Sequence, residues 1–136
     1  DLPPEEADEY EELMRDAGLC SIWLVAPTTP EQRVKEIVNR GSGFIYYISR
    51  EGVTGMQQNV SESIADMTGI IRSQTDLPIA VGFGISNPEQ ARQVADCSDA
   101  IVVGSAIVNQ VAEHGDAPNM VQQVAGYVKT LVEAIK

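Results

Sequence analysis

Three glycine-bearing segments contain the residues with the clearest capacity for chemistry. Each follows an apolar run, and they read Gly52-Val53-Thr54-Gly55, Gly82-Phe83-Gly84-Ile85-Ser86 and Gly104-Ser105. Glycine allows a backbone to approach an anion closely, and the N-terminus of a helix offers free N–H groups with a partial positive charge. A single glycine here could equally serve a turn. Three such segments at equivalent points of a repeating pattern predict a phosphate site that needs no Lys or Arg.

Standard nucleotide-binding motifs are missing from these segments. Gly82 and Gly84 begin a dinucleotide fingerprint, but Asn87 stands where its third glycine is required. No Gly-Lys-Ser or Gly-Lys-Thr occurs, which excludes a P-loop. The predicted strand ends also show no paired carboxylates and no Ser/His/Asp arrangement. We therefore expect a binding site without an evident catalytic acid or base in these residues.

Two tyrosines and a single histidine are the remaining candidates. In the run Phe44–Ile48, alternation along a strand places Tyr46 and Tyr47 on opposite faces. We expect Tyr46 to point toward a ligand and Tyr47 to pack beneath helices, although a packing role for both is equally compatible with the pattern. His114 lies in a polar Glu-His-Gly-Asp stretch with no partner at catalytic spacing, so we expect it at the surface.

Composition narrows the class of protein. The chain has 136 residues, of which 43% are hydrophobic, and a net charge of −11 that argues against nucleic-acid binding. No apolar run reaches the ~18 residues of a membrane span, so we expect no membrane association and a cytoplasmic location. Cys20 and Cys97 are too few for a disulfide framework or a zinc site, and we expect no metal. A start at Asp1, with no initiator Met, suggests a piece of a longer protein.

Helical and strand-like patterns alternate along the chain. We expect helices over 4–17, from Thr29 to about 40, over about fifteen residues after a polar loop that ends at Asn59, from Ser86 to about 95, around Val108 and Val111, and over 120–135; strands are expected over 21–26, 44–48, 79–83 and 100–103. Thr29 with Pro30 has the pattern of a helix N-cap, and the segment from Ser86 to Gln90 repeats it. The last helix carries a regular apolar stripe that we expect to be buried.

This order predicts an α/β protein with a parallel sheet and right-handed crossovers. Two architectures fit: an open doubly wound sheet, and part of a (βα)8 TIM barrel. A complete barrel has eight strands and roughly 250 residues, and this chain has about half of each. In both architectures ligands bind beyond the carboxyl ends of the strands.

Five segments, in their order and spacing, resemble the tryptophan synthase alpha-subunit family. They are Leu24–Pro30, Gly43–Ser49, Gly52–Gly55, Leu77–Ser86 and Val103–Val108. The resemblance covers essentially all of residues 1–136. It implies a single segment with four parallel strands and flanking helices, the C-terminal half of a (βα)8 TIM barrel. These would be strands five to eight, with the N-terminal half absent.

The resemblance also implies an activity and a set of site residues. The family is a lyase of tryptophan biosynthesis that cleaves indole-3-glycerol phosphate, by a retro-aldol reaction, into indole and glyceraldehyde 3-phosphate. The residues carried over by motif are Gly55, Phe83, Gly84, Gly104 and Ser105 for the phosphate, Tyr46 beside the indole-glycerol pocket, and Thr54 to orient the catalytic aspartate. The family's catalytic acid and base come from the N-terminal half, so none is expected here. No cofactor is expected except pyridoxal phosphate in the partner beta subunit of a heterotetramer.

Other interpretations stay open at this point. The chain could belong to another phosphate-binding TIM-barrel enzyme, such as one like thiamin-phosphate synthase or indole-glycerol-phosphate synthase. It could be a noncatalytic half-barrel that only binds phosphate or a partner chain, or an unrelated open-sheet regulatory domain. Half a barrel leaves two unpaired sheet edges, which we expect an N-terminal half-barrel or a second copy to cover.

Overall fold

Four parallel strands form the centre of the molecule. The computed structural model describes residues 2–49, 57–82 and 84–136. Within them the strands β1 (Trp23–Val25), β2 (Ile45–Ile48), β3 (Ile79–Gly82) and β4 (Ala100–Val102) pair in sequence order. Every pairing is parallel, which confirms the predicted α/β half-barrel arrangement.

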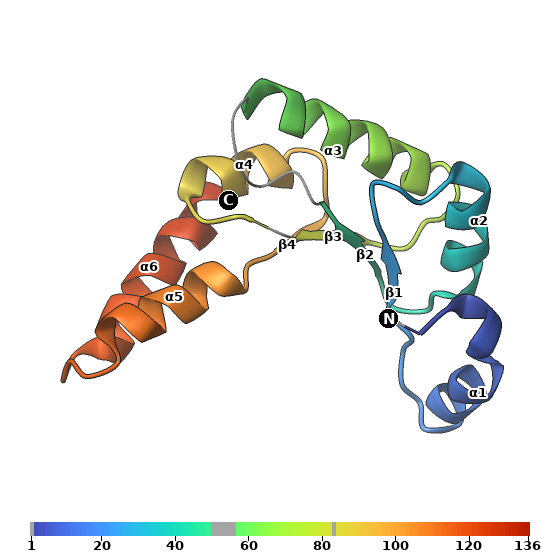
Figure 1. Ribbon diagram of the computed structural model, residues 1–136, viewed down its shortest axis with the longest axis horizontal. Coiled ribbons are helices and arrows are strands. Elements are labelled where there is room, and N and C mark those ends of the chain that lie inside the picture. Colours follow the sequence, from blue (N-terminus) through green and yellow to red (C-terminus); the bar gives the residue numbers. More distant parts are fainter. Residues whose placement is uncertain (1, 50–56, 83) are drawn as a thin grey trace.

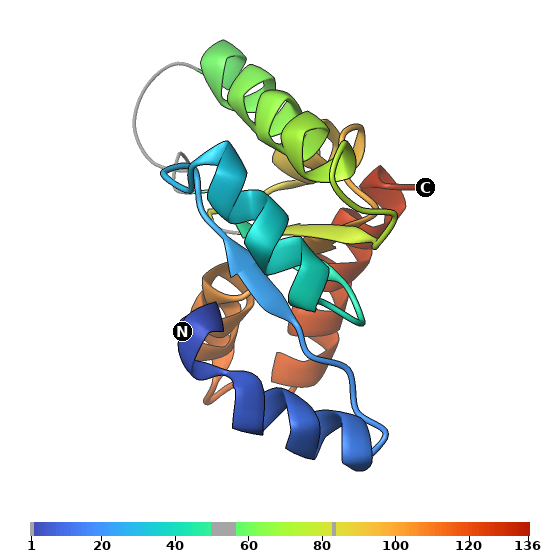
Figure 2. The same ribbon diagram turned by 90° about the vertical axis from the view of Figure 1, so that its right-hand side faces the viewer.

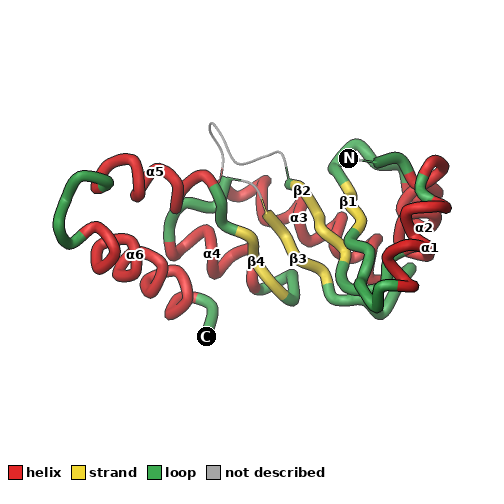
Figure 3. Tube along the Cα trace, turned by 90° about the horizontal axis from the view of Figure 1, so that it is seen from below, coloured by secondary structure: helices red, strands yellow, loops and turns green. Residues whose placement is uncertain are grey.

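Helices connect the strands and cover one side of the sheet. They are η1 (Pro4–Glu6), α1 (Asp8–Asp16), α2 (Glu31–Arg40), α3 (Gln57–Arg72), α4 (Pro88–Ala95), α5 (Ser105–His114) and α6 (Met120–Ala134). In Figure 1, α2, α3 and α4 lie along the outer side of the curved sheet, α1 lies beside the β1 end, and α5 and α6 extend from the β4 end. Figure 3 shows the strands from the opposite side, with no helix in front of them.

The hydrophobic core lies between the sheet and α2, α3 and α4. Alternate strand residues enter it: Ile45 and Tyr47 of β2 are buried, whereas Tyr46 and Ile48 are only half-buried. The core also receives Val34 of α2. β1 shows the same alternation, whereas all four residues of β3, between two neighbouring strands, are buried. Alternating burial is what a barrel strand shows when its outer face meets helices and its inner face remains open.

The first strand is shorter than the predicted range of 21–26. Ser21, which the sequence assigned to the strand, donates its backbone N–H to the Ser42 hydroxyl at 2.9 Å, and the Ser42 N–H donates to the Ser21 carbonyl at 3.2 Å. These bonds join β1 and β2 before the regular pairing between Trp23 and Ile45 begins. Figure 2 shows β1, which follows these bonds in the chain, lying directly beside α2.

The two similar capping signatures behave differently. Asn87 caps α4 as a helix N-cap should, because its side-chain oxygen accepts the backbone N–H of Gln90 at 2.9 Å. The predicted cap by Thr29 is wrong: α2 begins at Glu31 after Pro30, with no side-chain cap. The Thr29 hydroxyl instead accepts the backbone N–H of Ala26 at 3.0 Å, so it closes the turn that follows β1.

The expected burial of the last helix is also wrong for the described residues. Of its predicted stripe only Leu131 is buried, while Val124 and Val128 are half-buried and Ile135 is 39% exposed. Among the described elements α6 packs mainly against α4 and α5, and its far side lines an open apolar groove of about 570 Å³. A periodic stripe is buried only where an element packs against it, and the described chain supplies partners on one side.

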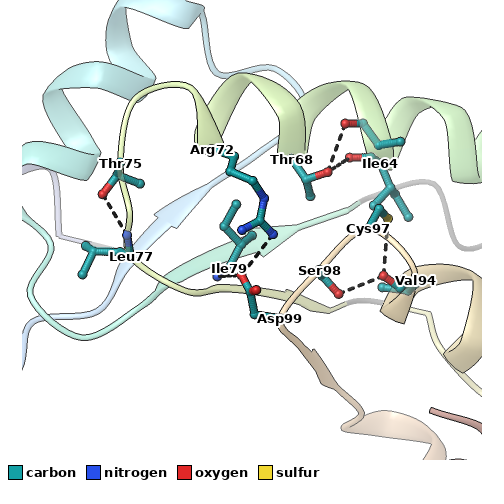
Figure 4. A network of polar contacts seen from close by, with 11 residues as sticks. Ile64, Thr68, Arg72, Thr75, Leu77, Ile79, Val94, Cys97, Ser98 and Asp99 are labelled. Carbon is teal, nitrogen blue, oxygen red and sulfur yellow. Dashed lines mark hydrogen bonds and ion pairs between the residues drawn. The ribbon is translucent and has the colours of Figure 1, made fainter. Parts of the chain in front are cut away.

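A polar network joins the beginnings of β3 and β4 at the end of the sheet opposite the glycine segments. The Asp99 carboxylate accepts the Ile79 backbone N–H at 2.8 Å and a guanidinium N–H of Arg72 at 3.1 Å, as Figure 4 shows. The Ile79 N–H holds the pKa of Asp99 below its ordinary value, and Arg72 adds to this effect, while partial burial opposes it. The negatively charged form is therefore favoured in the folded protein.

We predict that Asp99→Asn lowers the free energy of unfolding by about 1 kcal/mol at pH 7, the typical contribution of one such hydrogen bond. A carboxylate whose pKa is lower in the folded state stabilises that state at pH values above its unfolded pKa, near 3.9. This contribution is lost as the pH falls through the pKa of the folded state. Urea unfolding at pH 7 and pH 3 should therefore show the difference shrink in acid. Asp96→Asn, an exposed aspartate with no ion pair among the described residues, is the control. Equal losses at both pH values would contradict the assignment.

Candidate functional site

The strand register brings two of the glycine segments to one edge of the sheet. Gly82 of β3 pairs with Ile48 of β2 on one side and with Val102 of β4 on the other. Gly84 and Gly104 each lie two residues past this row, so they leave adjacent strands at the same carboxyl edge. Residues 52–55 follow β2, but Thr54 and Gly55 lie outside the described residues, as does Phe83.

Gly84 has a backbone conformation that favours glycine. Its φ of 77° lies in the left-handed region, where other L residues are strained. The next residue, Ile85, is 6% exposed and packs in the core, so the chain turns back to the sheet at once. Ser86 then donates its N–H to the side-chain oxygen of Gln90 at 2.9 Å, which joins the turn to the first turn of α4.

The N-terminus of α5 is open, unlike that of α4. Gly104 precedes α5 without a side-chain cap, and its carbonyl accepts the N–H groups of Ile107 at 2.9 Å and Val108 at 3.2 Å. The N–H groups of Ser105 and Ala106 precede these first helical bonds and are available to an anion. A Cβ built on Gly104 meets nothing within 4 Å, and Ser105 is exposed. Space therefore remains in front of the helix.

Tyr46 and Tyr47 lie on opposite faces, as the alternation predicted. Tyr47 is 2% exposed within the core, whereas Tyr46 lies half-buried on the open face. The ring of Tyr46 crosses directly over Gly82: a Cβ there would lie 2.6 Å from the Tyr46 hydroxyl oxygen and 2.9 Å from Cβ of Val102. Glycine at position 82 is what allows this tyrosine to lie across the strands beside the glycine edge.

Side chains from two other elements hold the β3–α4 connection. Ser49, buried at the end of β2, donates its N–H at 3.0 Å and its hydroxyl at 3.3 Å to the Gly82 carbonyl. Tyr127 of α6 donates its hydroxyl to the Ser86 carbonyl at 2.9 Å. Neither contact was predicted from the sequence, because the Tyr127 partner lies 41 residues away and no local pattern marks the pair.

The described part of this edge combines the uncapped N-terminus of α5 with few of the side chains that usually transfer protons. The stretches after β1, β3 and β4 (26–29, 84–87 and 103–106) contain no carboxylate, His, Cys or Lys. Across the residues that the structure describes, no cluster of His, Cys, Asp and Glu could hold a metal ion. His114, which we expected at the surface, is the half-buried last residue of α5.

The cysteines occupy ordinary positions. Cys20 is exposed, and Cys97 is half-buried, with its thiol 3.3 Å from the Val94 carbonyl. Burial, with the nearby Asp96 carboxylate, raises the pKa of the Cys97 thiol, so it stays protonated near neutral pH. Within the described residues, no helix is both long enough and apolar enough to cross a membrane.

The fold and the edge together define a class: a parallel α/β half-barrel with backbone amides and glycines at the carboxyl edge of its sheet. Comparison with known proteins identifies the member of this class. The model of the tryptophan synthase alpha chain family matches residues 1–136, and the chain belongs to that family. The match corresponds to the C-terminal half of its relatives.

Curated relatives and solved structures agree with this assignment. The chain is 50% identical over 121 residues to the tryptophan synthase alpha chain of Opitutus terrae, covering 89% of this chain and 46% of that protein. It is 44% identical over 137 residues to that of Phenylobacterium zucineum, covering 100% and 50%. The structure of tryptophan synthase subunit alpha from Legionella pneumophila superposes with a TM-score of 0.83 at 34% identity, covering 99% and 49%. The chain thus spans about half the length of the relatives it matches.

We predict that Gly82→Ala displaces Tyr46 and lowers the free energy of unfolding by about 1–3 kcal/mol, the usual cost of overpacking. Thermal unfolding should show this loss, and it should be smaller in a Tyr46→Ala background, where only the contact with Val102 remains. Gly126→Ala is the matched control, since its new Cβ meets nothing within 4 Å and helix propensity favours Ala. Equal losses from Gly82→Ala in both backgrounds would show that Tyr46 does not lie over the glycine.

Proposed function

We propose that this chain forms the phosphate-binding half of a tryptophan synthase alpha subunit. In the proposal the complete protein cleaves indole-3-glycerol phosphate to indole and glyceraldehyde 3-phosphate during tryptophan biosynthesis. The observation that carries the proposal is the register of β3 and β4. It brings Gly84 and Gly104 to one edge beside the uncapped N-terminus of α5.

Phosphate binding in this proposal depends on backbone groups. The free N–H groups of Ser105 and Ala106 donate to phosphate oxygens, aided by the partial positive charge at the start of α5. The Ser105 hydroxyl supplies one more donor, and Gly84 brings its backbone close from the neighbouring strand. Gly55 and Phe83 complete the proposed phosphate contacts. The net charge of −11 belongs to the whole chain, whereas the helix N–H groups act within the first turn, at contact distance from the anion. The acidic composition is therefore compatible with the proposed phosphate site.

The open face of the sheet suits the rest of the substrate. Tyr46 lies half-buried across Gly82, next to the proposed phosphate position, and Leu24 aligns with Tyr46 in the neighbouring strand. We assign Tyr46 to the border of the indole-glycerol pocket. Thr54, which follows β2, is assigned to orienting the catalytic aspartate. An aromatic face and aliphatic neighbours favour a planar indole ring.

Cleavage itself needs groups that the described edge does not contain. Breaking the carbon–carbon bond to indole requires a proton delivered to the ring carbon and another removed from a glycerol hydroxyl. Positioned carboxylates perform such transfers and typically contribute ~10²–10⁴-fold in rate each. We assign this acid and base to an N-terminal half-barrel, which faces the substrate from across the barrel. No cofactor takes part, and pyridoxal phosphate belongs to the proposed beta subunit.

The sheet edges support the same assembly. β1 pairs with β2 alone and β4 pairs with β3 alone among the described strands. Exposed edges attract other strands, so they need cover. We assign that cover to an N-terminal half-barrel, or to a second copy when the half is missing. The complete protein would act in the cytoplasm within a heterotetramer with the beta subunit.

We predict that this chain alone cleaves indole-3-glycerol phosphate no faster than buffer, because it lacks the acid and base. A chimera in which the N-terminal half of the Opitutus terrae alpha chain precedes these 136 residues should cleave it, and added beta subunit should raise the rate. Indole release followed by chromatography measures both. Turnover by the chain alone that persists through further purification would contradict the assignment of the acid and base.

In the same chimera, Gly104→Val should abolish binding of glycerol 3-phosphate while the fold survives. The valine side chain would occupy the open space in front of α5 and meets no described atom within 4 Å of its Cβ. Ser105→Ala should cost less, about 1–2 kcal/mol, for one hydrogen bond to a charged group. Isothermal titration gives the affinities, and circular dichroism checks the fold. Gly84→Val is a poorer probe, because its φ of 77° adds backbone strain. Normal binding by the Gly104→Val variant would show that the site is misplaced.

A further inference from the structure

α6 contacts the connection that carries Gly84. Its Tyr127 packs against the hydrophobic core with its ring half-buried, and its hydroxyl donates to the Ser86 carbonyl at 2.9 Å. Burial raises the pKa of Tyr127, so the hydroxyl keeps its proton throughout the neutral range. Figure 1 shows the C-terminal part of α6 passing beside α4, against which it packs.

The N–H, the hydroxyl and the carbonyl of Ser86 all form hydrogen bonds. Its N–H donates to the Gln90 side-chain oxygen at 2.9 Å, and its hydroxyl donates to the same oxygen at 3.2 Å. Its carbonyl accepts the Tyr127 hydroxyl. The orientation of the peptide at Ser86 is thus fixed from the α4 side and from the α6 side together.

The other end of the connection is fixed as well. Two hydrogen bonds from Ser49 hold the Gly82 carbonyl at the end of β3. Gly84 therefore lies between two anchored carbonyls, those of Gly82 and Ser86. The first anchor comes from the neighbouring strand, and the second comes from a helix that follows both glycine segments in the chain.

α6 also packs against α5, the helix whose open N-terminus follows Gly104. One helix therefore contacts the β3–α4 connection through Tyr127 and supports α5 along its side. This arrangement links the positions of Gly84 and of the α5 amides, which come from different strands. A phosphate that accepts hydrogen bonds from both is sensitive to their separation, because such bonds weaken steeply with poor geometry.

From these contacts we propose that Tyr127 is a positioning residue, whose hydroxyl sets the place of the Gly84 backbone relative to the N-terminus of α5 for binding a phosphate monoester. The proposal rests on the proposed function. Loss of the hydroxyl leaves the aromatic ring in the core, and water can reach the exposed Ser86 carbonyl. The fold therefore survives the loss, whereas the alignment of the two backbone donors does not.

The test uses Tyr127→Phe in the chimera described above, with Tyr10→Phe as the matched control. Tyr10 lies on α1, is 42% exposed and is remote from the glycine edge in sequence and sheet order. We expect Tyr127→Phe to raise KM for indole-3-glycerol phosphate, and Kd for glycerol 3-phosphate, about threefold to tenfold, the range of one hydrogen bond. The kcat and the thermal midpoint should stay close to those of the unmodified chimera, and amide exchange at Ile85 and Ser86 should quicken.

The outcomes separate this inference from the function beneath it. If the unmodified chimera fails to bind glycerol 3-phosphate, the proposed function is wrong and the inference falls with it. If the unmodified chimera binds but Tyr127→Phe binds equally well, only the inference is overturned. A fall in kcat at unchanged KM would indicate a loss of folded protein rather than of alignment, and also overturns it. An equal rise in KM for Tyr10→Phe would show that the effect is not specific.

Discussion

The close approach of three strands at Gly82 is the constraint on which the rest of the site depends. Its carbonyl accepts two hydrogen bonds from Ser49, its pairing fixes Ile48 and Val102 in one row, and its missing side chain leaves room for Tyr46. Because the register is set there, the glycines two residues further on reach the same edge. Any side chain at position 82 would press on Tyr46 and Val102 together, so one residue controls both the ring and the spacing of the strands.

This constraint is compatible with the proposed anion site in a strongly acidic chain. The charges are spread over helix surfaces, where Arg33 and Arg40 of α2 pair with Glu5, Asp8 and Glu11 of the acidic N-terminal segment. The glycine edge carries no charged side chain in its described stretches after β3 and β4. Backbone N–H groups there act at contact distance, while the acids of η1 and α1 lie near the β1 end of the sheet and are screened by water and salt. The nearby N–H donors therefore determine the electrostatic potential at the glycine edge more than the distant acids do.

Much of this arrangement could be predicted from the sequence, because it depends on local patterns. The alternation of elements, the opposite faces of Tyr46 and Tyr47, and the glycines at strand ends are all periodic or adjacent features. The errors arose where a contact outside the recognised pattern, local or distant, decides the outcome. The same capping signature works at Asn87 and fails at Thr29, since the Thr29 hydroxyl finds the Ala26 N–H. The apolar stripe of α6 says which face can be buried, but not whether an element covers it. The contact between Tyr127 and Ser86 has no sequence signal at all.

The division of the barrel also separates binding from chemistry. The proposed phosphate site needs only neighbouring connections, and those after β3 and β4 lie at one edge of the described sheet. An acid and a base that act on two sides of one substrate must approach it from different directions, and four adjacent strands present their ends along a single arc. The apolar groove on α6 agrees with the proposed assembly, in which further elements of a complete barrel would lie against this half. The proposed function therefore assigns the phosphate to this half of the fold and leaves cleavage to the closed ring.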